Sequence, residues 1–245
     1  MSMSIRVRDL SKSFKGHTVL DRVSLDLTAA ERVALIGANG AGKTTLVRCL
    51  LGQYRCVGEI RLGGLAPRLR RAEVLARVSF VPQLPPPLRM PVGSFLRFAA
   101  EICGGEARSM AAVAERLGLR IGPIRSRPFV KLSGGQKQKL LIAVALGRRT
   151  DLLLLDEPAA NLDPKARKVF FELLEERRGQ ATMLISSHRL EDVAHLVGRV
   201  VEMDQGRVTV DDRLEAGRVR AAARLASASG TAAPGAERPV REVRQ

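Results

Sequence analysis

The glycine-rich stretch GANGAGKT, residues 37–44, constrains the fold of this chain more than any other feature of the sequence. It fits the pattern G-x-x-x-x-G-K-[ST] in full, follows the apolar segment RVALIG (32–37) and leads into TTLVRCLLG (44–52). A strand, a glycine loop and a helix in this order form a phosphate-binding loop, in which backbone N–H groups and the helix N-terminus face phosphate oxygens. The stretch therefore predicts an α/β fold that binds a nucleotide by its phosphates, with a chance glycine turn as the alternative.

Two side chains of this loop have expected tasks of their own. Lys43 places a positive charge at the β- and γ-phosphates, and the hydroxyl of Thr44 is an expected ligand of Mg²⁺. ATP and Mg²⁺ are therefore the expected ligands. The residues expected to contact the nucleotide are Gly37, Asn39, Gly40, Gly42, Lys43, Thr44 and Thr45.

Two adjacent carboxylates end the apolar segment LLLLDE, residues 152–157. We expect a buried strand here, with Asp156 holding Mg²⁺ through water and Glu157 polarising the water that attacks the phosphate. General-base assistance of this kind is typically worth about 10²–10⁴-fold in rate. A solvated strand end is the alternative, and the phosphate loop elsewhere in the chain argues against it.

Three further residues are candidates because of their places along the chain. His188 follows the apolar strand ATMLISS (181–187), which we expect beside the strand that carries Asp156. There it would sense the γ-phosphate, although a lone histidine at a strand end is more often structural. Gln83 follows the strand VSFV, and its side-chain carbonyl could bind Mg²⁺ or water. Considered without the other residues, Gln83 more simply binds no ligand. Phe14 either stacks on adenine or belongs to the core.

The remaining patterns divide the chain into sheet-forming parts, a helical insertion and a tail. Alternating residues predict antiparallel strands near the N-terminus, and the proline run LPPPLRMP predicts an exposed connector, since proline continues neither a strand nor a helix. The predicted strands cover 5–10, 23–27, 32–37, 57–62, 78–83, 151–158 and 181–187, with a hairpin over 198–210. The predicted helices cover 44–52, 92–103, 108–119 and 164–178, and a basic Ala- and Arg-rich tail, largely disordered, covers 212–245.

Charge and composition limit the class of partner. The chain has a formal net charge of +16, 3% aromatic residues and no tryptophan. An excess of positive charge is typical of proteins that bind nucleic acid, an anionic membrane surface or polyanionic ligands, and it also occurs in proteins that simply have an arginine-rich surface. Because no aromatic residues are interleaved with the basic ones, a platform for single-stranded nucleic acid is disfavoured. We therefore expect no direct contact with nucleic acid.

Apolar runs and cysteines limit the location. The longest uncharged apolar runs, 140–147 and 152–155, are too short to cross a bilayer, and the N-terminus shows no secretory pattern. Cys49, Cys56 and Cys103 lack the spacing of metal ligands, so we interpret them as reduced structural thiols. The cytoplasm is the expected location.

A second glycine turn, LSGGQ at 132–136, points to a family. Together with GANGAGKTT, Gln83, LLLLDEP, NLD and His188, in this order and spacing, it resembles the ATP-binding-cassette (ABC) ATPases over residues 4–211. LSGGQ is the most discriminating part, because many phosphate-loop proteins lack it. The resemblance implies a P-loop NTPase cassette, here 1–211, with a mixed core sheet, an antiparallel β subdomain and a helical subdomain over about 84–150.

The resemblance further implies a head-to-tail homodimer or heterodimer with two ATP molecules at its interface. Asp163 would communicate across that interface, Phe14 would stack on adenine, and Gln83 would line the groove that receives the coupling helix of an integral-membrane permease. The turn that would contact the ATP of the other subunit consists of Ser133, Gly134, Gly135 and Gln136. The implied catalytic residues are Lys43, Gln83, Glu157 and His188, and the implied metal ligands are Thr44, Gln83 and Asp156.

This chain departs from the usual family pattern at a few positions. Ala159 and Asn161 stand near positions where the family usually has Ser or Thr and Ser or Gly, and Phe14 stands for the usual Tyr. Lys137 and Lys139 stand where many members have an Arg. None of these differences removes a catalytic group, so both ATP sites of a homodimer should be competent.

The expected role is the ATP-hydrolysing subunit of an ABC transporter, peripheral on the inner face of the cell membrane and coupled to separate membrane subunits. The single-cassette layout resembles two-component bacterial exporters, and the ANLD and SSHR stretches resemble the NosF group, associated with copper-site assembly of nitrous oxide reductase. A soluble ABC ATPase that acts on an assembly scaffold or on nucleic acid is the alternative. A third class, a binding module without hydrolysis, is disfavoured by the intact Lys43, Asp156, Glu157 and His188.

Overall fold

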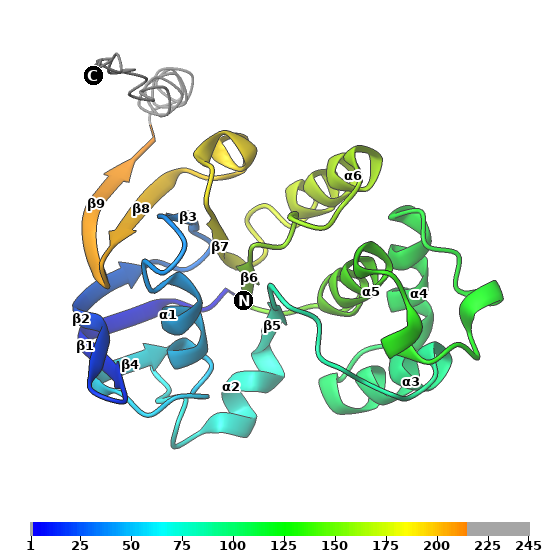
Figure 1. The fold of residues 1–245 in the computed structure, drawn as a ribbon, viewed down its shortest axis with the longest axis horizontal. Coiled ribbons are helices and arrows are strands. Elements are labelled where there is room, and N and C mark those ends of the chain that lie inside the picture. Colours follow the sequence, from blue (N-terminus) through cyan, green and yellow to red (C-terminus); the bar gives the residue numbers. More distant parts are fainter. Residues whose placement is uncertain (1, 215–245) are drawn as a thin grey trace, which may run out of the picture.

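The computed structural model describes residues 2–214 of the 245, and they form two β-sheets and a helical lobe (Figure 1). The strands are β1 (Ile5–Phe14), β2 (His17–Leu27), β3 (Arg32–Ile36), β4 (Val57–Leu62), β5 (Val78–Val81), β6 (Leu152–Asp156), β7 (Thr182–Ser187), β8 (Arg199–Asp204) and β9 (Arg207–Arg213). The α-helices are α1 (Lys43–Leu50), α2 (Arg71–Arg77), α3 (Val92–Cys103), α4 (Ala107–Arg116), α5 (Gly134–Leu146) and α6 (Pro164–Glu175). The predicted α/β class, with a mixed sheet, an antiparallel sheet and a helical part, is confirmed.

The smaller sheet is antiparallel, with the strand order β2-β1-β4. Buried apolar residues alternate with exposed polar ones along much of β1 and β2, so that one face packs on the core and the other meets solvent. Both strands are longer than predicted. Their ends beside the turn, where Phe14 pairs with His17, lack the alternation of buried and exposed residues that predicts a strand.

The central sheet has the order β5-β6-β7-β3-β8-β9, in which only β9 runs antiparallel to its neighbour. All residues of β6 and β7 are buried, as expected for parallel strands covered on both faces. Leu152 and Leu154 of β6 face the core that contains α1, whereas Leu153 and Leu155 face the core that contains α6. The carboxyl ends of β3, β6 and β7 therefore meet at one edge of the sheet, where the predicted site residues follow.

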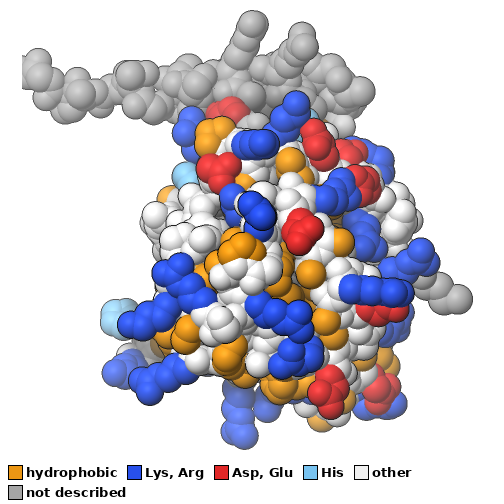
Figure 2. Space-filling model, turned by 90° about the vertical axis from the view of Figure 1, so that its right-hand side faces the viewer, with side chains coloured by type: hydrophobic (Ala, Val, Ile, Leu, Met, Phe, Trp, Pro, Cys, Tyr) orange, Lys and Arg blue, Asp and Glu red, His pale blue; other side chains and the backbone are white. Residues whose placement is uncertain are grey.

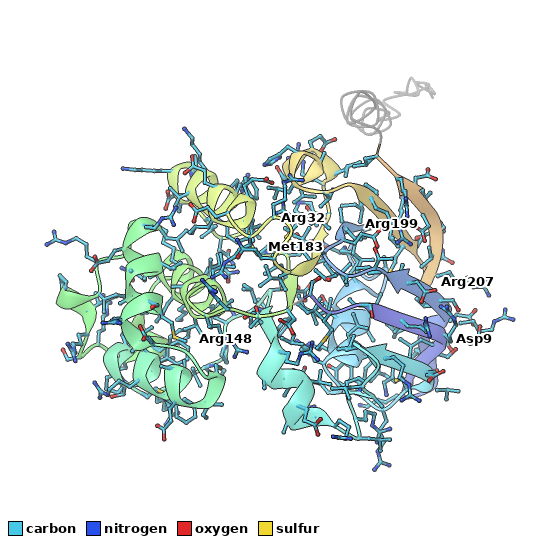
Figure 3. The ribbon with its side chains drawn as sticks, turned by 180° about the vertical axis from the view of Figure 1, so that it is seen from behind. Asp9, Arg32, Arg148, Met183, Arg199 and Arg207 are labelled. Carbon is cyan, nitrogen blue, oxygen red and sulfur yellow. The ribbon has the colours of Figure 1, made fainter. Side chains whose placement is uncertain are left out.

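The helical lobe packs α3, α4 and α5 around a third core (Figure 1). Its outer surface, which faces the viewer in Figure 2, bears many Lys and Arg side chains. Helix α5 belongs to two cores, since Leu140 packs within the lobe and Ile142 packs against the sheet. Figure 3 shows Arg148 where this helix meets the sheet, and its Nη2 donates to the carbonyl of Ala76 at 2.5 Å.

Two further differences from the sequence prediction concern α2 and β9. Helix α2 is additional, and only Val74 of its seven residues is buried, so that it carries no amphipathic pattern to detect. Strand β9 reaches Arg213, beyond the predicted boundary at 211, and pairs with β8 although most of its side chains are exposed. The predicted tail from 215 onward lies outside the described residues. Among the residues described, no helix is both long and apolar enough to cross a bilayer.

Candidate functional site

The glycine-rich loop connects β3 to α1 and forms a cavity of about 290 Å³ at the edge of the central sheet. Gly42 has φ 104°, and a Cβ there would lie 2.9 Å from the carbonyl oxygen of Val19, so that only glycine fits. The loop and the strands beside it line the cavity with Val19, Ala38, Asn39, Gly40, Ala41, Gly42, Lys43, Thr44, Thr45, Gln83 and Glu157. Six of the seven loop residues predicted to contact the nucleotide, all except Gly37, therefore surround one space.

Lys43 begins α1, and its ammonium group bends back over the loop. Its Nζ donates to the carbonyls of Gly37 at 2.5 Å and Ala38 at 3.1 Å, and it lies 3.9 Å from Oε1 of Glu157. Burial lowers the pKa of Lys43 below its usual value, while the nearby carboxylates of Glu157 and Asp156 act in the opposite direction. A buried cation held by neutral carbonyls is well placed to exchange them for phosphate oxygens.

The two carboxylates at the end of β6 have different surroundings. Asp156 is almost fully buried, and its Oδ1 accepts a hydrogen bond from the Ser186 hydroxyl at 2.7 Å. The same hydroxyl accepts from the backbone N–H of Glu157 at 2.9 Å. Ser186 therefore ties both carboxylate residues to β7, and it faces Asp156 directly in the strand register.

Glu157 is held in a conformation that few glutamates adopt. Its φ is +46°, in the left-handed region, and its Oε1 is buried without a hydrogen-bond partner. His188 follows β7, and its Nδ1 lies 3.0 Å from Oε2 of Glu157. Since β6 and β7 are neighbours, as expected, the carboxylate stands between Lys43 and His188, with one oxygen left for a further polar partner such as water.

Gln83 follows β5 and lines the same cavity as Thr44 and Glu157. An amide carbonyl and a hydroxyl are hard oxygen donors, which Mg²⁺ prefers, and Mg²⁺ keeps several water ligands in nucleotide sites. Among the residues described, no group of three His, Cys, Asp or Glu side chains could hold a metal by itself. The cavity therefore fits Mg²⁺ that arrives with nucleotide phosphates better than an all-protein metal site.

Phe14 lies at the end of β1 and is not among the residues that line the cavity. Its ring meets that of Tyr54 edge-on, with centroids 5.1 Å apart, and Nζ of Lys12 lies 4.4 Å from its centroid. The Tyr54 hydroxyl in turn accepts a hydrogen bond from Arg48 of α1 at 2.7 Å. The ring is 37% exposed, so that part of it remains open to a ligand.

The LSGGQ turn lies apart from the cavity of its own chain. Ser133 caps α5 by accepting from the N–H of Gln136 at 3.2 Å, and the Gln136 side chain accepts from the Ser133 N–H at 3.0 Å. Ser133 and Gly134 are exposed, and neither lines the phosphate cavity. The turn presents the N-terminus of a helix to solvent, which is the arrangement that attracts anions.

Helix α5 is nevertheless connected to the segment that follows Glu157. Gln138 is fully buried and donates from Nε2 to the carbonyl of Pro158 at 3.0 Å. Nζ of Lys139 lies 2.6 Å from Oδ2 of Asp163, whose Oδ1 caps α6 by accepting from the N–H of Ala166. The hydrogen bond from Lys139 lowers the pKa of Asp163.

Sequence reasoning missed Ser186, Gln138 and Tyr54. A serine in an apolar strand and a glutamine in a helix carry no local signal, because their roles depend on segments that are distant in the chain. Tyr54 had one available signal, since it is the only tyrosine in the sequence and follows the phosphate-loop helix closely.

Comparisons with known proteins identify the family of the chain. A family model described as "ABC transporter" matches residues 20–160. The chain is 37% identical to a putative ABC transporter ATP-binding protein of Synechocystis, over 85% of this chain and 74% of that protein. It is 36% identical to an aliphatic sulfonates import ATP-binding protein of Streptomyces avermitilis, over 89% and 79% of the two chains. A solved structure titled as the ATP binding subunit of an ABC transporter superposes with a TM-score of 0.78 and 28% identity, over 90% and 94%.

The family model covers more than half of the chain, and the similarity to these relatives extends over most of both partners. At the cavity, the carboxylate of Glu157 lies between Lys43 and His188. The chain belongs to the ABC transporter family, as one of its ATP-binding and ATP-hydrolysing cassettes.

Proposed function

We propose that this cassette powers a membrane transporter, with Glu157 as the base that polarises the attacking water. The observation that carries the assignment is the position of Glu157, whose two carboxylate oxygens lie 3.9 Å from Lys43 Nζ and 3.0 Å from His188 Nδ1. Its unpartnered Oε1 gives water a buried acceptor beside the phosphate loop. Lys43 binds the phosphates, and His188 orients the carboxylate and senses the γ-phosphate.

The remaining site residues bind ATP and its metal. Thr44 and Gln83 would hold Mg²⁺ directly, and Asp156 would do so through water, because one of its oxygens is engaged by Ser186. The metal supplies positive charge that offsets the charge developing on the phosphates. The backbone N–H groups of the loop that begins at Gly37 surround the phosphates, and the exposed part of the Phe14 ring stacks on adenine.

A dimer completes each site. In the turn of Ser133, Gly134, Gly135 and Gln136 the first two residues are exposed, and none of the four lines the cavity of its own chain. The turn is therefore free to close over ATP held by a second subunit. Asp163 forms an ion pair with Lys139, which lies on the helix that begins at this turn. We therefore expect Asp163 to transmit closure of the dimer to the second subunit. ATP binding would close the dimer and hydrolysis would reopen it.

The motion would pass to separate integral-membrane permease subunits, which places this chain on the inner face of the cell membrane. The sulfonate-import relative supports a transporter role over the soluble alternative, an ABC ATPase that acts on a scaffold or nucleic acid. The resemblance to the NosF group stays a prediction. Co-purification from detergent extracts should recover a protein with several membrane spans, and recovery only with ribosomes or DNA would contradict the transporter role.

Glu157→Gln tests the catalytic assignment. The amide retains the shape of the side chain but not its basicity, so we expect ATP turnover to fall by about 10²-fold or more while ATP binding persists and a nucleotide-bound dimer accumulates. Glu172→Gln, an exposed position on α6, is the matched control and should turn over normally. Near-normal turnover of Glu157→Gln would overturn the role of Glu157.

A further inference from the structure

The turn that follows α1 is fixed by its own backbone. Gly52 has φ +66°, and a Cβ there would lie 2.8 Å from the carbonyl oxygen of Pro67, so that only glycine fits. The N–H of Gln53 donates back to the carbonyl of Arg48 at 2.9 Å. The chain therefore leaves the helix along one path, and Tyr54, half-buried against the core that contains α1, comes next.

The pairing of β1 with β4 then places Tyr54 beside Phe14. Ser11 of β1 pairs with Val57 of β4 in an antiparallel register. The same register, continued by three residues on each strand past this pair, brings Phe14 opposite Tyr54. The two ring centroids are 5.1 Å apart with the ring planes at 82°, which is the edge-on arrangement that aromatic pairs prefer. Two segments that are distant in the chain therefore meet through their rings.

Arg48 holds Tyr54 against α1. Its Nη1 donates to the Tyr54 hydroxyl at 2.7 Å, and its guanidinium carbon lies 5.8 Å from the centroid of the Tyr54 ring. Thr44 and Thr45, which line the phosphate cavity, lie about one turn earlier on the same helix. A series of contacts therefore runs from the phosphate loop through Arg48 and Tyr54 to Phe14.

The hairpin that carries Phe14 also lines the phosphate cavity. Val19 lies on β2, the strand that returns from the turn where Phe14 pairs with His17, and it is one of the residues around that cavity. Phe14 is 37% exposed, and Nζ of Lys12 lies over its ring, 4.4 Å from the centroid. The more exposed of the two rings therefore belongs to the hairpin beside the cavity, and the half-buried ring of Tyr54 packs against it.

A ring that stacks on a base binds it best when the ring is already oriented. An unsupported phenylalanine on an exposed turn would lose rotamer freedom on binding, and that loss weakens affinity. The edge-on contact with Tyr54 restricts the Phe14 ring in advance, and the hydrogen bond from Arg48 restricts Tyr54. Affinity for the base should therefore depend on Tyr54 even though the base contacts Phe14.

We propose that Tyr54 is a positioning residue for the nucleotide base, because it holds the Phe14 ring in the orientation that stacks on adenine. Arg48 fixes Tyr54 to the helix that begins at the phosphate loop. This inference rests on the proposed stacking of Phe14 and adds the residue through which the fold controls it. Since Tyr54 acts on the ring alone, it affects binding of the base and leaves binding of the phosphates at Lys43 unchanged.

The test compares ADP with inorganic pyrophosphate, which lacks the adenosine group, in calorimetric titrations of the full chain with Mg²⁺. In Tyr54→Leu the Kd of ADP should rise by about three- to tenfold, the factor expected for one well-placed aromatic pair, while the Kd of pyrophosphate should stay within about twofold. In ATP turnover, KM should rise and kcat should stay within about twofold, as expected when uniform binding is lost. Tyr54→Phe keeps the ring, so it should bind ADP within about twofold of the unmodified chain.

Phe98→Leu is the matched control, because it removes a ring that is 49% exposed on α3, and it should change neither affinity. Each variant should unfold thermally within about 6 °C of the unmodified chain, and Tyr54→Met replaces a Tyr54→Leu that fails this check. If Tyr54→Leu weakens ADP and pyrophosphate equally, or leaves both affinities unchanged, the proposal is overturned while the stacking role of Phe14 stands. An equal loss of ADP affinity in Tyr54→Phe and Tyr54→Leu would overturn it too, because the ring would then not be what positions Phe14.

A double-mutant cycle tests whether Tyr54 acts through Phe14. Phe14→Leu should weaken ADP binding at least as much as Tyr54→Leu, and Phe14→Leu/Tyr54→Leu should bind ADP like Phe14→Leu alone. Additive losses would show that Tyr54 acts independently of the ring and would overturn the proposal. Unchanged ADP affinity of Phe14→Leu would instead overturn the adenine stacking itself.

Fluorescence gives an independent readout, since Tyr54 is the only tyrosine and the chain has no tryptophan. ADP should change the tyrosine emission, pyrophosphate should change it less, and Phe14→Leu should lose the response to ADP. An equal response to ADP and pyrophosphate would assign Tyr54 to the phosphate site and overturn the proposal.

Discussion

The Ser186 hydroxyl forms hydrogen bonds with both Asp156 and Glu157, and Ser186→Ala measures how much these bonds contribute to stability and to ATP turnover. In the structure the hydroxyl donates to Asp156 Oδ1 at 2.7 Å and accepts from the Glu157 N–H at 2.9 Å, and Ser186, Asp156 and Glu157 are all buried. Removing the hydroxyl leaves two buried polar groups without these partners, each at a cost of about 1–3 kcal/mol. The free energy of unfolding should therefore fall by about 2–6 kcal/mol, which for a chain of this size lowers Tm by about 4–24 °C.

Urea and thermal unfolding measure the stability, and ATP turnover measures the effect on Glu157. We expect ATP turnover to fall by about tenfold or more, because the backbone N–H of Glu157 loses the hydrogen bond that holds this residue in position. Ser94→Ala is the control, since Ser94 is half-buried and has a single hydrogen bond, from Arg97 at 3.2 Å; it should change stability by less than about 0.5 kcal/mol. A similarly small effect of Ser186→Ala would refute the reasoning.

Three other predictions follow from the site. Ser133→Arg should abolish hydrolysis while leaving ATP binding at the phosphate loop largely intact, and equal loss of both in a binding titration would argue against a turn that serves the second subunit. Gln138→Met loses the hydrogen bond to Pro158 but also removes the unpartnered buried Oε1. The free energy of unfolding should therefore change by less than about 1.5 kcal/mol, while ATP turnover falls. Unchanged turnover would show that α5 does not position Glu157. Burial, with a smaller effect of the Cys56 thiol, raises the pKa of Cys49 to about 12, so only about one thiol in 10⁴ is ionised at pH 8. Iodoacetamide should therefore label Cys103 before Cys49, which should react only above about pH 11 or after unfolding, as peptide mass spectrometry can check.

Motifs that bind a ligand through backbone geometry could be predicted from the sequence. GANGAGKT, LLLLDE and His188 each follow a strand of the central sheet, and parallel strands bring their carboxyl ends together, so the meeting of Lys43, Glu157 and His188 follows from local patterns alone. The capped start of α5 could also have been predicted from LSGGQ, since serine at the cap and glutamine three residues later satisfy two backbone donors between them.

The rest of the site depends on contacts between distant segments. Ser186 matters because the register of β6 and β7 places it opposite Asp156, and no pattern within a single strand encodes that register. Gln138 matters because α5 crosses the segment after β6 at the level of Pro158. Helix α2 was not predicted because it has only one buried residue, so its sequence shows no helical periodicity of apolar residues.

The left-handed backbone of Glu157 has a consequence for the evolution of this protein. A residue other than glycine in that region costs about 1–2 kcal/mol, a large share of the stability of an ordinary domain. Glycine at 157 would remove the strain and with it the carboxylate, and asparagine would reduce it. A library of variants selected for heat resistance alone should therefore drift away from glutamate at this position, and only simultaneous selection for ATP turnover would retain it.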